Sequence, residues 1–197
     1  MIRTFIAIEL EPAVITKIAN AVEQLKTQIA GIRWTLPANF HFTFKFLGDI
    51  EQSQVDSVAN ALQREVHPFS RFTINAKGLG VFPGPRRPRI LWVGLTGIEL
   101  ARLAAKVESA LEPLGFAPEQ RSFTPHLTIG RWRQFDRAPD SLRQELERWK
   151  DFEFGGSSVD EVSLFQSVLK PAGAIYSRLK VVKLKNDGPG EGGSRWT

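Results

Sequence analysis

A four-residue motif occurs twice in this chain, as His41-Phe42-Thr43-Phe44 and again as His126-Leu127-Thr128-Ile129. His67 is the only other histidine among the 197 residues. Successive side chains of a β-strand point to opposite faces of a sheet. In a strand, each copy therefore places His and Thr on one face and two apolar residues on the other. The motif predicts two strands that each have a chemically active face and a core face.

Paired histidines are suited to proton transfer in both directions. Imidazole titrates near neutral pH, so one ring can act as a general base while a second ring acts as a general acid. Two motif strands that lie side by side across an internal two-fold axis would bring both rings around one cavity. A lone histidine in a strand is more often structural, but the recurrence of His-x-Thr on one face favours a functional interpretation of the pair.

Three more residues extend this candidate site toward an anion. Thr43 and Thr128 can donate hydroxyl hydrogen bonds to phosphate oxygens. Threonine also favours β-strands, so strand propensity alone could explain both residues. Arg131 follows Gly130, where we expect the strand to end, and a guanidinium there can bind phosphate through two hydrogen bonds. A solvated surface arginine is the alternative. His67 precedes a proline in an expected turn and has no threonine companion, so we leave it out of the site.

The composition restricts the class of protein. No cysteine is present, which excludes disulfides, thiolate nucleophiles and cysteine-ligated metal sites. No apolar run approaches the roughly 20 residues of a membrane span, so we expect no membrane insertion and a cytoplasmic location. The net charge of +5 favours a polyanionic partner such as RNA. The loop with Arg86, Arg87 and Arg89 either contacts an RNA backbone or is an ordinary solvated loop.

Hydrophobic spacing predicts an α+β chain in which a helix precedes each motif strand. Apolar residues recur at helical spacing over 12–29, 55–66 and 100–114, and in a short helix near 142–149. Besides the second motif strand, strands are expected over 1–10, 40–47, 69–81, 89–95, 158–169 and 174–184. The strands 69–81 and 89–95 should form a hairpin. The Gly-rich tail 186–197 is expected to be mobile.

Several segments together resemble the RNA 2′,3′-cyclic phosphodiesterases, also called 2′-5′ RNA ligase-like proteins, of the 2H phosphoesterase superfamily. The resemblance rests on segments 3–8, 34–48, 88–94, 123–131 and 162–167, in this order. It implies a bilobal α+β fold with two antiparallel sheets around a central cleft, pseudo-two-fold symmetry and helices on the outside. Residues 1–185 would then form one bilobal catalytic domain, and each lobe would contribute one His-x-Thr strand.

The same resemblance implies hydrolysis of a terminal 2′,3′-cyclic phosphate of RNA to a 2′-phosphate, with no metal or other cofactor. Some members of the family also join tRNA halves through a 2′-5′ linkage. Carried over to this chain, His41 is the proton donor and His126 the proton acceptor, while Thr43, Thr128 and Arg131 match phosphate-binding positions. The expected partner is RNA with a 2′,3′-cyclic phosphate end, such as a tRNA half, and the expected oligomeric state is a monomer. A bell-shaped pH dependence around neutrality should follow, because the two rings must differ in protonation.

Two other functions are compatible with these residues. A related enzyme would act on another small cyclic phosphate or on a 2′-5′ oligonucleotide, and its preference for substrate length would reveal it. A noncatalytic RNA-binding module would use the basic residues and would bind RNA without turnover.

Overall fold

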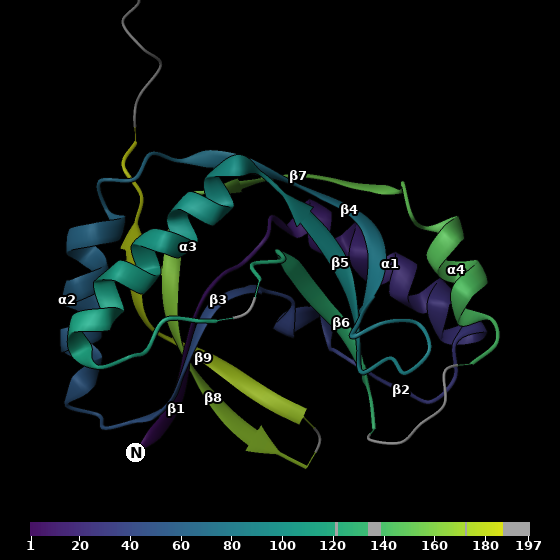
Figure 1. Ribbon diagram of the computed structural model, residues 1–197, viewed down its shortest axis with the longest axis horizontal. Helices are drawn as coiled ribbons and strands as arrows, with labels where there is room; N and C mark the ends of the chain where they lie inside the picture. The colour runs from purple at the N-terminus through teal and green to yellow at the C-terminus, as the bar shows by residue number, and fades with distance from the viewer. Residues whose placement is uncertain (121, 134–138, 172, 187–197) are drawn as a thin grey trace, which may run out of the picture.

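The strands of the computed structural model form two antiparallel sheets (Figure 1). The structure describes residues 1–120, 122–133, 139–171 and 173–186. Its strands are β1 (Ile2–Ile8), β2 (Ile32–Trp34), β3 (Phe42–Ile50), β4 (Phe72–Phe82), β5 (Ile90–Thr96), β6 (His126–Trp132), β7 (Glu153–Val159), β8 (Glu161–Lys170) and β9 (Gly173–Lys183). The first sheet has the order β3-β1-β8-β9 and the second the order β2-β6-β5-β4-β7. The predicted α+β fold with two antiparallel sheets is therefore confirmed.

The predicted helices form where apolar residues recur at helical spacing. They are α1 (Pro12–Gln28), α2 (Gln54–Val66), α3 (Ile98–Leu111) and α4 (Leu142–Arg148), with short 3-10 turns η1 (Pro37–Asn39) and η2 (Glu112–Leu114). Pro12 suits the first turn of α1, where an N–H would have no partner within the helix. After η2 the chain turns at Gly115, whose φ of 89° is left-handed and favours glycine.

The two sheets share one pattern of connections. β1 leads through α1 to its sheet neighbour β3, and β5 leads through α3 to its sheet neighbour β6. The order β3-β1-β8-β9 thus matches β6-β5-β4-β7, and β2 is an extra edge strand beside β6. This equivalence gives the fold its pseudo-two-fold symmetry. It also makes β3 and β6, the two motif strands, counterparts of one another.

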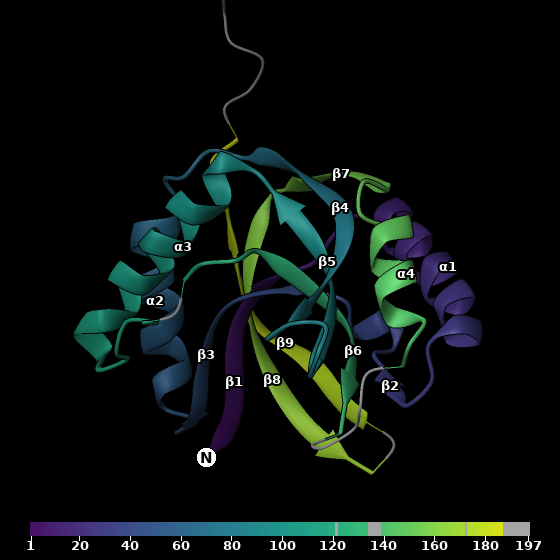
Figure 2. The same ribbon diagram turned by 45° about the vertical axis from the view of Figure 1, so that its right-hand side comes forward.

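The helices cover the outer faces of the two sheets (Figures 1 and 2). α2 contacts β9 and α3 contacts β3, whereas α1 contacts β7 and α4 contacts β4. In both views α2 and α3 lie on one side of the molecule, and α1 and α4 lie on the other. α1 precedes β3 of the first sheet but covers the second sheet, and α3 precedes β6 of the second sheet but covers the first. Each half of the fold is therefore covered by a helix that leads into a strand of the other half.

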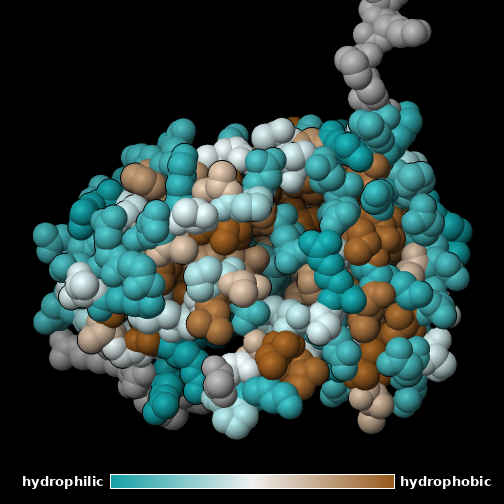
Figure 3. Space-filling view, turned by 180° about the vertical axis from the view of Figure 1, so that it is seen from behind, coloured by the Kyte–Doolittle hydropathy of each residue, from teal (hydrophilic) through white to brown (hydrophobic). Residues whose placement is uncertain are grey.

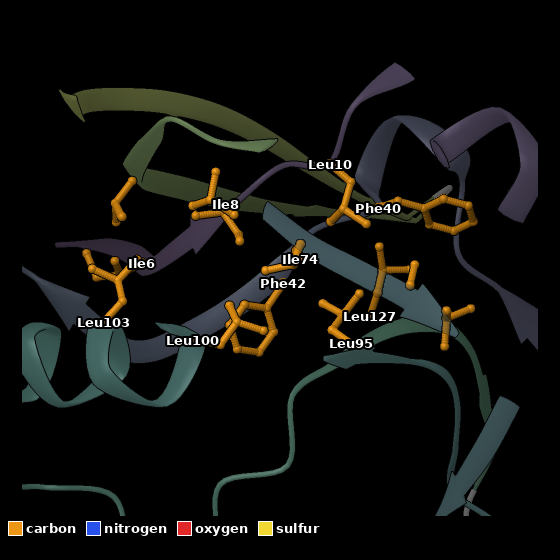
Figure 4. Packing of buried hydrophobic residues seen from close by; sticks show 14 of the residues in the cluster. Ile6, Ile8, Leu10, Phe40, Phe42, Ile74, Leu95, Leu100, Leu103 and Leu127 are labelled. Carbon is orange, nitrogen blue, oxygen red and sulfur yellow. The ribbon is translucent and has the colours of Figure 1, made fainter. Parts of the chain in front are cut away.

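One continuous cluster of buried apolar residues spans both sheets. Figure 4 shows this cluster from close by; its members include Ile6 on β1, Leu103 on α3, Phe42 on β3, Ile74 on β4 and Leu127 on β6. The single bilobal domain over 1–185 stays a prediction, with this shared core in its favour. The predicted mobile tail lies outside the described residues, apart from its first residue.

Apolar side chains on the surface form separate patches. Figure 3 shows, on the face opposite to that of Figure 1, patches of hydrophobic residues that are bordered by hydrophilic ones. Phe46 of β3 and Leu169 of β8 are among the exposed apolar residues, with 64% and 66% of their surfaces accessible. Within the described part of the chain, no helix combines the length and the apolar character that a membrane crossing requires.

Several strands differ from the sequence-based prediction, while the predicted hairpin of β4 and β5 is confirmed. β3 does not end at Gly48: this glycine has a φ of 73° beside an irregularity of the ladder, and the strand continues to Ile50. The predicted strand over 158–169 is two strands, because Asp160 separates β7 of the second sheet from β8 of the first. β2 was not predicted, since three residues are too few to show a period.

Candidate active site

The two motif strands contact each other although they belong to different sheets. His41 directly precedes β3, and His126 is the first residue of β6. The histidines are half-buried, whereas Phe42 and Leu127, which follow them, are buried. The predicted division into a chemical face and a core face is therefore present in both copies of the motif.

Both imidazole rings are held by the same kind of backbone contact. Nδ1 of His41 lies 2.8 Å from the carbonyl oxygen of Asn39, and Nδ1 of His126 lies 2.7 Å from that of Thr124. A carbonyl oxygen can only accept a hydrogen bond, so Nδ1–H is the donor in each ring. Nε2 then carries the lone pair of a neutral ring or the second proton of a charged ring. Each Nε2 is therefore the atom that can accept or donate a proton.

Each imidazole also packs against two aromatic side chains of its own sheet. His41 lies beside Phe5 of β1 and Tyr176 of β9, with ring-centroid distances of 4.8 and 5.1 Å. The second imidazole lies beside Phe82 of β4 and Trp92 of β5, at 4.9 and 6.2 Å. These rings restrict the orientation of the two imidazoles and exclude water from one side of each.

Thr43 and Thr128 lie on the same strand faces as the histidines, two residues further along. Both are half-buried, and no group in the described part of the chain forms a hydrogen bond with either hydroxyl. Thr43 pairs with Ala7 of β1, and Thr128 pairs with Trp92 of β5. Both hydroxyls are available to an anion.

Arg131 reaches the site for a reason that the sequence did not reveal. The expectation that β6 ends at Gly130 is wrong, because the strand continues to Trp132. In a regular strand, a residue three positions after Thr128 would point to the opposite face. The ladder with β5 has an irregularity here: Trp92 pairs with Thr128, whereas the preceding Leu91 pairs with Gly130. This bulge reverses the alternation and puts the exposed Arg131 on the face of His126.

The first motif has a bulge at the equivalent place, with a different result. Ala7 of β1 pairs with Thr43, whereas the preceding Ile6 pairs with Lys45. Lys45 therefore points to the helix-covered face, where its Nζ forms an ion pair with Glu108 of α3. The lysine is buried there, with only 8% of its surface accessible. The residue that corresponds to Arg131 in this copy is the exposed Phe46. Only the second motif strand thus supplies a cation to the active face.

The electrostatic surroundings connect the two imidazoles. Burial lowers the pKa of His41 and the pKa of His126 below the ordinary value of 6.5, because the charged ring loses hydration. The hydrogen bonds to the carbonyls of Asn39 and Thr124 oppose this effect on each pKa. Arg131 lowers the pKa of both rings further, since its cation disfavours a second positive charge nearby. Arg131 is therefore an electrostatic neighbour that the two rings share.

Glu9 distinguishes the two imidazoles from one another. Its carboxylate raises the pKa of His41, in opposition to burial, and it does not contribute to the shift at His126. Glu9 lines a small recess of about 40 Å³ together with His41 and Tyr176. It also forms an ion pair with Arg178 of β9, which holds the carboxylate in place. Of the two imidazoles, only that of His41 has a neighbouring carboxylate that stabilises its protonated form.

Gly80 of β4 makes room for the indole that packs against His126. A Cβ atom at Gly80 would lie 2.1 Å from the Trp92 ring, far inside contact distance. Gly80→Ala is therefore expected to lower the free energy of unfolding by about 1–3 kcal/mol, as overpacking of a filled interior does. Gly84→Ala is the matched control, because a Cβ there meets nothing within 4 Å. Equal denaturant midpoints for the two variants would contradict this packing.

The remaining prediction about the site excludes His67 from it. His67 ends α2, and its Nδ1 lies 2.7 Å from the carbonyl oxygen of Lys183, so it has a separate structural contact. Sequence reasoning did not identify Phe5, Tyr176 and Glu9 as neighbours of His41. The alternation of β1 places Phe5 on one face, but only the sheet order brings β1, β9 and the first motif together.

The sequence has close counterparts among known proteins. A family model described as LigT-like phosphoesterase matches residues 8–92 and 96–176. The RNA 2′,3′-cyclic phosphodiesterase of Methanothermobacter thermautotrophicus is 33% identical over 184 residues, which cover 93% of this chain and 99% of that protein. The protein of the same name from Aeropyrum pernix is 38% identical over 152 residues, or 76% of this chain and 85% of the relative.

Solved structures show the same fold. The crystal structure of TT0787 of Thermus thermophilus matches with a TM-score of 0.79 and 23% identity, over 94% of this chain and all (100%) of that one. The crystal structure of E. coli LigT complexed with 3′-AMP matches with a TM-score of 0.74 and 23% identity, over 94% of this chain and 99% of that one. The two-sheet architecture is thus shared across nearly the full length of these proteins.

Proposed function

The chain belongs to the LigT-like phosphoesterase family, and on this basis we propose that it hydrolyses the 2′,3′-cyclic phosphate at the end of an RNA to a 2′-phosphate. The observation that carries the proposal is the contact between β3 and β6, the strands that follow His41 and begin with His126 and that belong to different sheets. The names of the curated relatives support the substrate. Paired acid and base groups around an anion-binding cation are the equipment that this reaction needs.

In the proposed mechanism, neutral His126 accepts a proton from water through Nε2 while the water oxygen attacks the cyclic phosphorus. Protonated His41 donates its Nε2 proton to the departing 3′ oxygen, so the bond from phosphorus to that oxygen breaks as the new one forms. The phosphate stays on the 2′ oxygen. The hydroxyls of Thr43 and Thr128 and the guanidinium of Arg131 stabilise the negative charge that develops on the phosphate oxygens.

One feature favours this assignment of acid and base. The carboxylate of Glu9 supports the protonated form of His41, the proposed donor, and does not contribute at His126. Arg131 disfavours the protonated form of both rings and so does not distinguish them. The two Nδ1–H bonds to backbone carbonyls keep both Nε2 atoms free for the substrate.

The proposed reaction is tested with an RNA that ends in a 2′,3′-cyclic phosphate. The expected product carries a 2′-phosphate, and turnover is expected to persist in EDTA because the proposed steps use only side chains. Formation of a 3′-phosphate would contradict the roles given to the two oxygens. Turnover of small cyclic phosphates alone would indicate a different substrate class, and RNA binding without turnover would indicate a noncatalytic module.

The pH dependence of kcat/KM should be bell-shaped, with its maximum on the acid side of neutrality. Burial and Arg131 lower the pKa of both imidazoles below 6.5 in the free enzyme. As the pH rises through these values His41 loses the proton that it must donate, and as the pH falls His126 gains a proton and cannot accept another. A bound phosphate anion raises both pKa values, so the limbs of kcat should lie at higher pH. A kcat/KM that stays flat between about pH 5 and 9 would contradict the paired roles.

The wider setting is also part of the proposal. RNA fragments with cyclic phosphate ends, such as tRNA halves, are the proposed natural substrates, and the cytoplasm is the proposed location. We also propose that the protein is a monomer. Ligation of such ends through a 2′-5′ linkage would break the same bond to the 3′ oxygen, with a 5′-hydroxyl in place of water as the nucleophile.

A further inference from the structure

An open groove lies between the loop that joins β4 to β5 and helix α4. Its volume is about 550 Å³, and its lining residues are Pro83, Gly84, Pro85, Arg86, Arg87 and Arg143. We call it the arginine groove. Three guanidinium groups of this lining come from two elements that are far apart in the sequence but adjacent in the fold (Figures 1 and 2).

No carboxylate in the described part of the chain pairs with the cations of the arginine groove. In the described ranges of the chain, Arg86, Arg87 and Arg143 form no ion pair, and all three are exposed. Many cations elsewhere on the surface do face carboxylates: Lys26, Lys77, Lys106, Lys150, Arg178 and Lys180. Positive charge that is left without a partner, beside proline rings, suits a partner with both anionic and apolar parts.

The loop that lines the arginine groove connects, at both of its ends, to residues next to the candidate active site. Its first residue, Pro83, follows Phe82, whose ring packs against His126 at a centroid distance of 4.9 Å. The other end of the loop leads into Ile90, which pairs with Arg131. Arg131 pairs in turn with Arg33 on the edge strand β2. The loop of the groove therefore begins and ends beside residues of the candidate site, and cations lie at both places.

We propose that the arginine groove binds the phosphodiester backbone of the RNA substrate, on the 5′ side of the cyclic phosphate. This inference rests on the proposed function, because a 2′,3′-cyclic phosphate occupies the 3′ end of the chain. Every other phosphate of the substrate must then lie on its 5′ side. Guanidinium groups bind phosphates through paired hydrogen bonds, and the proline rings offer an apolar surface to riboses or bases.

The inference makes oligomeric RNA, and not a mononucleotide, the preferred substrate. A mononucleotide with a cyclic phosphate would fill only the part of the surface near the histidines and Arg131. An RNA of about ten nucleotides is long enough to cover the groove as well, since single-strand sites commonly span about 4–16 nucleotides. The additional phosphate contacts should appear as a lower KM and as a stronger dependence on salt.

The test compares two triple variants that lose the same charge. Arg86→Gln/Arg87→Gln/Arg143→Gln removes the guanidinium groups of the arginine groove. Arg64→Gln/Lys106→Gln/Lys180→Gln removes three exposed cations: two on α2 and α3, on the other side of the molecule, and Lys180 of β9, which pairs with Asp56 of α2. Each variant and the wild-type protein are assayed with a cyclic-phosphate RNA of about ten nucleotides and with a cyclic mononucleotide.

The groove variant is expected to lower the ratio of kcat/KM for the oligonucleotide over the mononucleotide about tenfold or more. The control variant should keep the wild-type ratio. Binding of an RNA that ends in a 2′-phosphate is measured as well, between about 50 and 200 mM salt. The slope of log K against log salt should become shallower by about 2 in the groove variant, at about 0.7 for each lost contact with single-stranded RNA.

The other outcomes separate this inference from the proposed function. An unchanged ratio and an unchanged slope in the groove variant would overturn the role of the groove while hydrolysis stands. An equal decrease of the kcat/KM ratio in the control variant would show a general effect of charge and would also overturn the role of the groove. If the wild-type protein hydrolysed neither substrate, the proposed function would fail, and the salt slope of RNA binding would still decide whether the groove holds RNA.

Discussion

Alanine in place of His41 or His126 is expected to lower kcat by about 10²–10⁴-fold, the usual contribution of one general acid or base. Each imidazole has a free Nε2 atom, because its Nδ1–H is donated to a backbone carbonyl. Alanine removes the proton-transfer atom and leaves the surrounding strands in place. The measurement is steady-state turnover of an RNA with a 2′,3′-cyclic phosphate end. The double variant should be little worse than the more damaged single variant, because residues that act as a unit are not additive.

His67→Ala provides the matched control for these two variants. His67 is exposed and its ring contacts the carbonyl of Lys183, so its loss should leave kcat near the wild-type value. Thermal unfolding of all the variants should be cooperative, which separates loss of chemistry from loss of structure. Wild-type turnover by either His41→Ala or His126→Ala would show that the ring concerned transfers no proton in the rate-determining step.

Replacement of Arg131 by glutamine should lower kcat by about 10²–10³-fold, comparable to the loss of one donor that stabilises an oxyanion. The same change should move both limbs of the kcat/KM profile to higher pH, because Arg131 lowers the pKa of both His41 and His126. Arg131→Lys keeps the positive charge but loses the paired hydrogen bonds. It should therefore retain a nearly wild-type pH profile and recover only part of the rate.

Arg33→Gln is the control for the loss of charge near this strand. Arg33 is exposed and pairs with Arg131 across β2 and β6, but it does not contribute to the pKa shift of either imidazole. Its replacement should leave the pH profile in place. A profile that moved equally in Arg33→Gln and Arg131→Gln would mean that Arg131 acts only through the overall charge of this surface.

Much of the fold follows from local sequence patterns. The spacing of Val14, Ile18, Val22 and Leu25 predicts α1, and the alternation in each His-x-Thr motif predicts which face is buried. These patterns are visible because buried positions recur at a fixed spacing over several turns of a helix or several residues of a strand. The hairpin of β4 and β5 was predicted for the same reason, together with its Pro- and Gly-rich loop.

The features that escaped prediction depend on pairing between distant segments. The bulges after Thr43 and Thr128 are defined by the register with β1 and β5, so a single strand does not reveal them. The bulge explains why Arg131 reaches the site although β6 does not end at Gly130. Most of β7 was missed because its centre, residues 155–158, is Gly-Gly-Ser-Ser and lacks β-branched and aromatic residues. Only the sheet order shows that it is a separate strand from β8.

The candidate site shows the same division between local and distant information. The two histidines, the two threonines and Arg131 carry recognisable motifs, so the sequence identified them as candidates. Phe5, Tyr176, Phe82 and Trp92 surround the imidazoles from four other strands, and no local pattern connects them with a histidine. The difference that Glu9 makes between the two rings likewise depends on the tertiary structure.

A crystal structure of the protein with an RNA that ends in a 2′-phosphate would decide whether both histidines serve one phosphate. The two-histidine mechanism predicts that Nε2 of His126 and Nε2 of His41 each lie about 2.6–3.2 Å from an oxygen at the reacting centre, on opposite sides of it. The hydroxyls of Thr43 and Thr128 should contact the remaining phosphate oxygens. A phosphate bound by only one of the imidazoles, with the other ring turned away, would contradict the mechanism.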